Sequence, residues 1–162
     1  MRLPSPKEPI DVLVRETILA VIGTHIRPRP QAREEATMPQ DWNGPPAPDE
    51  SGNIAVGGFN DFLKNHPDLR RSPVRATIKF VKLRDPAALK TRIRAQASQL
   101  ENPQETRVIL TEIGLPDDSV QAVRWALDFR RAGDRWRLES ARRTQRCQPG
   151  RGHQGFSPRP CK

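Results

Sequence analysis

The sequence contains no tyrosine, and aromatic residues make up only 5% of its 162 positions. No apolar run reaches the roughly 18 residues that a bilayer-spanning helix needs, which excludes such a helix. Hydrophobic residues account for 35% of the chain, below the roughly 45–50% of an average domain, although that average also counts glycine, and there are 17 prolines. This composition excludes a coiled coil and a large-core enzyme, and it indicates one domain with a modest core and proline-rich segments outside it.

The sequence also lacks the motifs of common enzyme classes. It has no Gly-x-Ser-x-Gly, no His-Glu-x-x-His, no Walker A loop and no Gly-x-Gly-x-x-Gly. Cys147, His153 and Cys161 fit no usual zinc-ligand spacing and lack a fourth partner. We therefore expect no metal, no cofactor and no catalytic residues, although a pairing of His25 with Asp128 stays open because sequence does not show proximity.

Cysteine is scarce, and its placement predicts a disulfide. The only two cysteines, Cys147 and Cys161, bracket a Pro/Gly-rich loop near the C-terminus, which indicates a bridge closing that loop. The alternative is two free thiols in a flexible tail. With the bridge, we expect a bacterial protein of the periplasm or envelope, whose leader is not seen in this sequence. Without it, the N-terminus lacks signal-peptide order and indicates a cytoplasmic protein.

Positive charge is plentiful and unevenly distributed. The formal net charge is +9, and arginine greatly outnumbers lysine, a usage that a GC-rich genome also produces. Most of the excess lies in Phe129–Lys162, which contains ten basic and two acidic residues. A basic end of this kind is typical of proteins that meet nucleic acid, anionic membrane or acidic partners.

Hydrophobic spacing predicts an α+β protein. Apolar residues at helical spacing predict three helices, over 10–23, 59–65 and 86–100. Apolar residues that alternate with polar ones predict four strands, over 74–83, 106–113, 119–131 and 135–146. We expect a curved antiparallel sheet of about four strands packed on one amphipathic helix. One face of this sheet is predicted to form a core without an acid or base: Val123, Trp125, Leu127, Phe129, Trp136 and Leu138.

The segments outside these elements are predicted from their proline and charge content. Residues 1–9 are expected to be a disordered leader, and 147–162 a basic tail closed by the disulfide. Between them, 10–146 is expected to form a single α+β domain with a proline-rich insertion at 27–57. Trp42, the insertion's only aromatic residue, is predicted to anchor it to the core.

A family resemblance is carried by the end of the predicted domain. The strand 120–131, its glycine-containing turn and the segment Gly133-Asp134-Arg135-Trp136-Arg137-Leu138 resemble the cystatin-like α+β cone of nuclear-transport-factor-like and SnoaL-like domains. The likeness covers roughly 58–146. The chain departs from the pattern in having one strand rather than a hairpin before 86–100, and in its long insertion. This fold hosts enzymes, ligand binders and scaffolds, so the resemblance implies a fold and leaves the function open. Separately, Cys147–Gln154 with Cys161 resembles the C-termini of uncharacterised bacterial envelope proteins.

Three classes of function remain. The first is an exported or envelope-associated binding protein without a catalytic role, which recognises acidic protein, lipid or glycan groups. Its predicted binding residues flank or lie in the disulfide loop: Arg142, Arg143, Arg146, Arg151 and His153. The alternative is a cytoplasmic nucleic-acid-binding protein using arginines on the outer sheet face, although no exposed aromatic pair accompanies them for base stacking. The third is a small-ligand-pocket enzyme of the cystatin-like superfamily.

Overall fold

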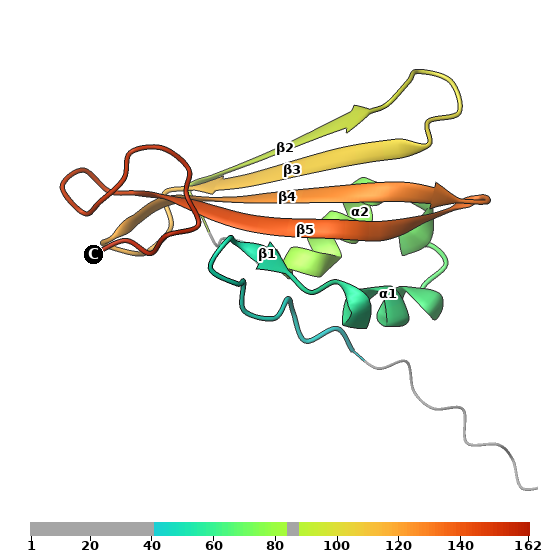
Figure 1. The fold of residues 1–162 in the computed structure, drawn as a ribbon, viewed down its shortest axis with the longest axis horizontal. Helices are drawn as coiled ribbons and strands as arrows, with labels where there is room; N and C mark the ends of the chain where they lie inside the picture. The colour runs from blue at the N-terminus through green and yellow to red at the C-terminus, as the bar shows by residue number, and fades with distance from the viewer. Residues whose placement is uncertain (1–40, 84–87) are drawn as a thin grey trace, which may run out of the picture. The chain divides into compact units, whose positions relative to one another are not determined.

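The computed structural model describes residues 41–83 and 88–162, so the predicted leader at 1–9 and helix at 10–23 lie outside the described residues. A short first strand is followed by the helices and then by four consecutive strands, all strands belonging to one antiparallel sheet, and the α+β class is confirmed (Figure 1). In chain order they are β1 Asn53–Ile54, α1 Gly57–Lys64, the 3-10 helix η1 Leu69–Arg71, α2 Pro73–Val81, β2 Lys90–Ala97, β3 Glu105–Ile113, β4 Val120–Ala132 and β5 Arg135–Cys147. No helix among them is long and apolar enough to span a bilayer.

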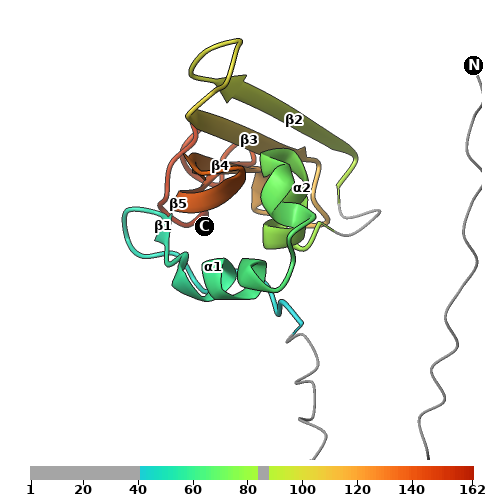
Figure 2. The same ribbon diagram turned by 90° about the vertical axis from the view of Figure 1, so that its right-hand side faces the viewer.

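The sheet has five strands in this part of the chain, not about four, in the order β1-β5-β4-β3-β2 with every neighbouring pair antiparallel. Helices α1 and α2 lie on the same face of the sheet (Figure 2). The predicted core face of β4 and β5 is confirmed, since all six of its residues are buried. Phe59, Phe62, Leu63 and Phe80 of the two helices pack in the same cluster. The opposite face carries no helix of the described chain.

The strongest sequence patterns gave the correct elements. α1, β3, β4 and β5 lie where helical or alternating spacing predicted them. The tight turn between β4 and β5 uses Gly133 at φ +66°, a backbone conformation that glycine adopts without the Cβ penalty. Trp42 also anchors its segment as predicted, because its Nε1 donates to the Phe80 carbonyl at 2.8 Å and its ring stacks on Phe80.

The predicted strand over 74–83 is wrong, because these residues form α2. Ala76, Thr77 and Phe80 are buried, a spacing that one helix face provides and one strand face does not. The helix begins with two ordinary start signals. The Ser72 hydroxyl accepts a hydrogen bond from the Arg75 amide, and Pro73 occupies the first turn. In a segment this short, the same apolar residues fit both strand alternation and helical spacing. The Ser72 cap and Pro73 are the signals that distinguish the helix from a strand.

The predicted helix over 86–100 is also wrong, since Lys90–Ala97 forms strand β2. The predicted inward residues Leu89 and Leu100 are 92% and 102% exposed and flank the strand rather than pack. β2 pairs with β3 along its whole length, from Lys90 opposite Ile113 to Ala97 opposite Thr106. A continuous ladder to a neighbouring strand thus overrides local helix signals. In the described part of the predicted insertion, Asn53–Ile54 likewise pairs with β5 as β1.

Candidate functional site

The C-terminal loop folds back onto the end of the sheet. Cys147, the last residue of β5, is fully buried and joined by a disulfide to Cys161, with the two Cα atoms 5.5 Å apart. Gln145 of β5 forms an isolated antiparallel bridge with Ser157, and the Cys147 amide donates to the His153 carbonyl at 3.1 Å. Backbone hydrogen bonds at Gln145 and Cys147 therefore join the loop to β5 in addition to the disulfide.

This loop places one aromatic ring against the helix-free face. The Phe156 ring lies under the Arg124 guanidinium, whose Cζ is 3.7 Å from the ring centroid. The Cζ atom of Arg146 lies 5.5 Å from the same centroid. Stacking of a guanidinium on an aromatic face is favourable and fixes the plane of the group. Phe156 thus holds two arginines from neighbouring strands at the end of the sheet.

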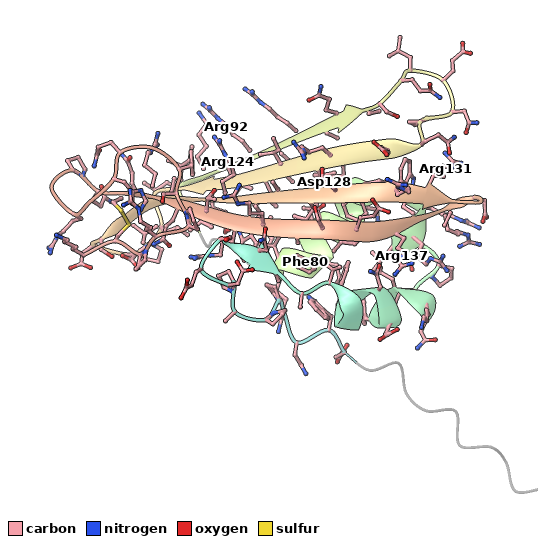
Figure 3. All side chains as sticks on the ribbon, in the orientation of Figure 1. Phe80, Arg92, Arg124, Asp128, Arg131 and Arg137 are labelled. Atoms are coloured by element: carbon pink, nitrogen blue, oxygen red, sulfur yellow. A yellow bond between two sulfur atoms is a disulfide. The ribbon has the colours of Figure 1, made fainter. Side chains whose placement is uncertain are left out.

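Four arginines gather beside Phe156, and we call them the arginine cluster: Arg92 and Arg94 of β2, Arg124 of β4 and Arg146 of β5. Register places all four on the helix-free face, since Arg92 pairs with Thr111 and Thr111 with Arg124. They line a cavity of about 300 Å³ together with Ile109, Thr111, Ile113 and Phe156. Figure 3 shows Arg92 and Arg124 towards the loop end of the sheet, away from Asp128.

The cluster has no acidic counterpart within the described residues. No carboxylate lines the cavity, and none of the four guanidiniums takes part in the ion pairs of residues 41–83 and 88–162. The Nε atoms of Arg124 and Arg146 are buried without a hydrogen-bond acceptor there. A buried donor without an acceptor costs free energy, so these two guanidiniums have an unmet demand for a hydrogen-bond acceptor.

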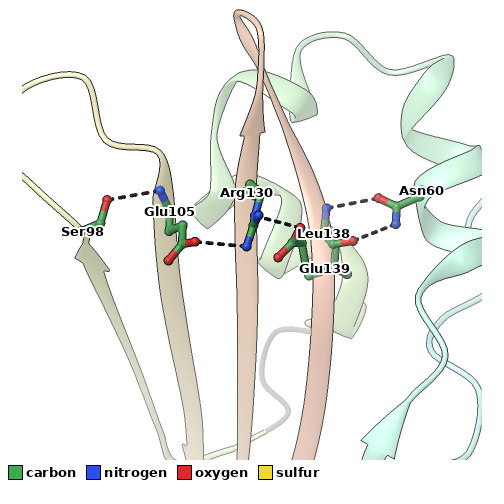
Figure 4. A network of polar contacts seen from close by, with 6 residues as sticks. All are labelled: Asn60, Ser98, Glu105, Arg130, Leu138 and Glu139. Atoms are coloured by element: carbon green, nitrogen blue, oxygen red, sulfur yellow. Dashed lines mark hydrogen bonds and ion pairs between the residues drawn. The ribbon is translucent and has the colours of Figure 1, made fainter.

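At the other end of the same face, Arg107 and Arg130 are paired with carboxylates. Arg107 holds Asp128 with two hydrogen bonds, of 2.6 and 3.1 Å, and Ser140 donates a third to that carboxylate. Arg130 lies between two carboxylates, at 3.1 Å from Glu105 and 3.0 Å from Glu139 (Figure 4). The guanidinium of Arg107 lowers the pKa of Asp128, with a smaller lowering by Ser140, while partial burial acts in the opposite direction. Arg107 and Arg130 thus have carboxylate partners, which none of the four arginines of the cluster has among the described residues.

The structure does not gather the five predicted binding residues on one surface. Arg146 belongs to the arginine cluster, but Arg142 donates to the Ser51 carbonyl and Arg151 lies 3.7 Å from Asp118. Arg143 lies on the core face, where its Cζ is 5.7 Å from the Trp125 ring centroid and burial lowers the pKa of its guanidinium. The two ring nitrogens of half-buried His153 each lie 2.9 Å from a carbonyl oxygen of the loop, Nδ1 from that of Gly155 and Nε2 from that of Arg159.

Cys147, His153 and Cys161 fit no usual zinc-ligand spacing along the sequence, but they lie close together in the structure. The ligand atoms of Cys147, His153 and Cys161 lie within 4.8 Å of one another. Both sulfurs are joined in the disulfide, however, and metal binding needs thiolates. In this state the group offers one imidazole nitrogen, which already lies 2.9 Å from the Arg159 carbonyl. Asp128, considered as a partner for His25, is occupied by Arg107 and Ser140, and His25 lies outside the described residues.

Sequence reasoning missed several residues of both faces. Glu112 is buried on the core face and accepts a hydrogen bond from Trp125 Nε1 at 3.2 Å, so that face is not free of acids. Arg92 and Arg94 were assigned to a helix and left out of the site. The signal was present, because arginines alternate with Ile93 and Ala95 as they do in a strand. Comparisons with protein-family models, curated proteins and solved structures found no match to this chain.

Proposed function

We propose that this chain is a small exported or envelope-associated binding protein, without a catalytic role, whose arginine cluster holds an anionic group of its partner. The partner's group belongs to an acidic protein, a lipid or a glycan. For the fold we propose a cystatin-like relation, supported by a four-strand meander with helices on one face. The disulfide supports export, because such bonds persist in oxidising compartments.

One observation carries the proposal: four guanidiniums from three strands surround a cavity in which no carboxylate balances them. Arginine remains protonated at any physiological pH, so the cluster keeps its charge. Two of its members are held in place by Phe156, and their Nε edges are already desolvated. An anion that accepts from the remaining N–H groups gains charge-assisted hydrogen bonds without first ordering the donors.

The cavity's chemistry favours binding over catalysis. Besides the arginines it is lined by two isoleucines, a threonine hydroxyl and Phe156. A general acid–base catalyst needs a group that titrates near the working pH, and none of these residue types does so. This supports the absence of a catalytic role for this cavity.

Nucleic-acid binding is the alternative that the arginines suggest. Single-stranded nucleic acid is usually bound by exposed aromatic rings next to basic side chains. Here the face of Phe156 is occupied by Arg124, and Trp125 and Trp136 are buried in the core. These contacts favour recognition of a small anionic group over stacking with bases.

The test is thermal unfolding of the full chain in phosphate, sulfate or acetate at constant ionic strength. A ligand present at 100 times its dissociation constant stabilises a protein by about 2.7 kcal/mol, which raises the midpoint by several degrees. We expect such a rise with at least one anion for the wild type. Arg92→Gln should reduce the rise to about half or less, as a tenfold or greater loss of affinity predicts. The matched control Arg137→Gln should keep it, because exposed Arg137 lies outside the cluster. No rise with any anion, or an equal rise in both variants, would overturn the proposal.

Two further measurements address export and the alternative. Mass spectrometry of the native protein without reductant should find Cys147 and Cys161 bridged, and free thiols at both would contradict export. An electrophoretic shift with DNA or RNA is expected to be absent at about 50 mM salt. A shift that persists there and is lost in Arg92→Gln would replace anion recognition with the nucleic-acid alternative.

A further inference from the structure

The arginine cluster has a composition that discriminates between classes of anion. A carboxylate carries one negative charge, so four guanidiniums around a single carboxylate would leave most of their charge unbalanced. A phosphate monoester carries roughly −1.5 to −2 at neutral pH and offers three acceptor oxygens. Planar guanidinium groups match those oxygens with paired N–H donors. Charge and donor number therefore both favour a multiply charged oxyanion.

The cavity also has apolar walls, and a bare inorganic ion would leave this apolar surface exposed to water. Ile109 and Ile113 of β3 point to the helix-free face between the arginines of β2 and those of β4 and β5. Both isoleucines are half-buried and line the cavity with Phe156. An organic group attached to the anion would remove this surface from water, at about 25 cal/mol for each Å² covered.

The size of the cavity limits the group that it encloses. A volume of about 300 Å³ is at the small end of ligand sites and accommodates a phosphate with a short or flat substituent. Thr111, at the centre of the four arginines by register, adds a hydroxyl that donates to an oxygen. A larger molecule would enter through its terminal phosphate and leave its remainder outside.

We propose that the arginine cluster binds the phosphate of a monoester whose organic group rests on Ile109, Ile113 and the edge of Phe156. This assignment rests on the proposed function and names its ligand class. Two sources share this chemistry, a small phosphate ester in solution and the headgroup of a monoester lipid such as phosphatidic acid. In both, the phosphate accepts from arginines of three strands and the attached carbon atoms cover the isoleucines.

The experiment is calorimetric titration of the full chain with phenyl phosphate, inorganic phosphate and benzoate at constant ionic strength. We expect phenyl phosphate to bind at least about tenfold tighter than benzoate, and tighter than inorganic phosphate because its ring covers the isoleucines. Its affinity should also rise between pH 5 and 7, since the second ionisation of a phosphate ester has a pKa near 6. An equal affinity for benzoate and phenyl phosphate, with both lost in Arg92→Gln, would overturn the ligand class and leave anion binding in place.

Variants separate this outcome from failure of the proposed function itself. Arg92 is exposed and not stacked on Phe156, so Arg92→Gln tests binding without loosening the loop. It should weaken phenyl phosphate binding about tenfold or more, whereas Arg137→Gln should change it less than about twofold. Ile109→Ser should reduce the preference for phenyl phosphate over inorganic phosphate. Absence of binding by all three probes, or equal losses in Arg92→Gln and Arg137→Gln, would overturn both proposals.

Vesicles distinguish the two sources of the ester. The full chain is sedimented with vesicles containing phosphatidic acid and with vesicles of equal charge density containing phosphatidylglycerol, a phosphate diester. A preference for phosphatidic acid that is lost in Arg92→Gln identifies the lipid as a source. Equal sedimentation with both vesicles, together with tight binding of phenyl phosphate, identifies a small ester in solution. Preference for the diester over the monoester would overturn the assignment.

Discussion

At the scale of single residues, neighbours decide what an arginine does in this protein. Arg107 and Arg124 lie on the same face of adjacent strands, yet one is bound to Asp128 and the other is stacked on Phe156. The sequence shows that both are basic, but not which of them has an acidic partner. That distinction depends on pairs more than 20 residues apart along the chain, and it separates a structural ion pair from a candidate site.

The Arg107–Asp128 pair should make stability depend on pH in the acidic range. The Arg107 guanidinium lowers the pKa of Asp128 in the folded state, so the folded protein binds this proton less readily than the unfolded chain does. The pair's contribution is therefore complete above about pH 4, the unfolded value, and is lost as pH falls through the lowered folded pKa. Because the pair is partly exposed, we expect about 0.5–1 kcal/mol.

The measurement is chemical unfolding of the wild type, Asp128→Asn, Arg107→Gln and the double variant between pH 2 and 7. The coupling energy of this cycle should be present at pH 7 and disappear near pH 2. A coupling energy that stays constant over the whole range would contradict the assignment of the lowered pKa to this pair.

Asn60 supports a second prediction at this scale, because it bonds to the backbone of β5 as a neighbouring strand would. Its Nδ2 donates to the Leu138 carbonyl at 2.8 Å and its Oδ1 accepts from the Leu138 amide at 3.1 Å (Figure 4). Asn60→Ala should lower the free energy of unfolding by about 1–3 kcal/mol, because both backbone groups lose these partners. Asp61→Asn, on the exposed side of the same helix, should change it by less than about 0.5 kcal/mol. Equal effects of both substitutions in urea titrations would show that the Asn60 contacts contribute little.

At the scale of elements, the predictions failed where a segment fitted both a strand and a helix. In β4 the apolar residues from Val123 to Phe129 alternate with polar or small ones, which favours a strand, whereas 74–83 fits both a strand and a helix. For 90–97 the arginines and small residues alternate, but the leucines at both ends favoured a helix, and both leucines are exposed. Arg92 and Arg94, half of the arginine cluster, belong to this strand, and predicting it as a helix left both of them out of the site.

The identity of α2 can be tested at its first residue. Ser72→Ala removes the hydroxyl that accepts from the Arg75 amide and should lower the free energy of unfolding by about 1 kcal/mol. Ser72→Asp keeps an acceptor at the helix N-terminus and should remain close to the wild type. Denaturant unfolding measures both. If this segment were the strand that its alternation suggested, Ser72→Ala would have no such cost, and equal stabilities of all three proteins would favour that arrangement.

At the scale of the described residues as a whole, the basic C-terminal end divides into several surfaces. Arg130 forms ion pairs with two carboxylates, and Arg143 is half-buried on the core face. Arg146 lies in the arginine cluster, beside the arginines of β2 and β4. Net charge counted along the chain therefore identifies the basic C-terminal end, but not which of its arginines lies beside Arg92 and Arg94. The disulfide was predictable from two cysteines alone, because no other pairing existed.

The disulfide should couple the stability of the fold to the candidate site. It closes a loop over a sequence separation of 14 residues, for which chain entropy predicts about 3 kcal/mol of stabilisation. The same loop carries Phe156 to Arg124, so its release also frees the guanidinium that the ring orders. Cys147→Ser/Cys161→Ser should lower the free energy of unfolding by about 3 kcal/mol in urea titrations. At a temperature where it is still folded, this variant should bind phenyl phosphate several-fold more weakly, and reduction of the wild type should reproduce both effects. Loss of stability with unchanged affinity would show that the remaining contacts of the loop, at Gln145 and Ser157, suffice to hold Phe156 in place.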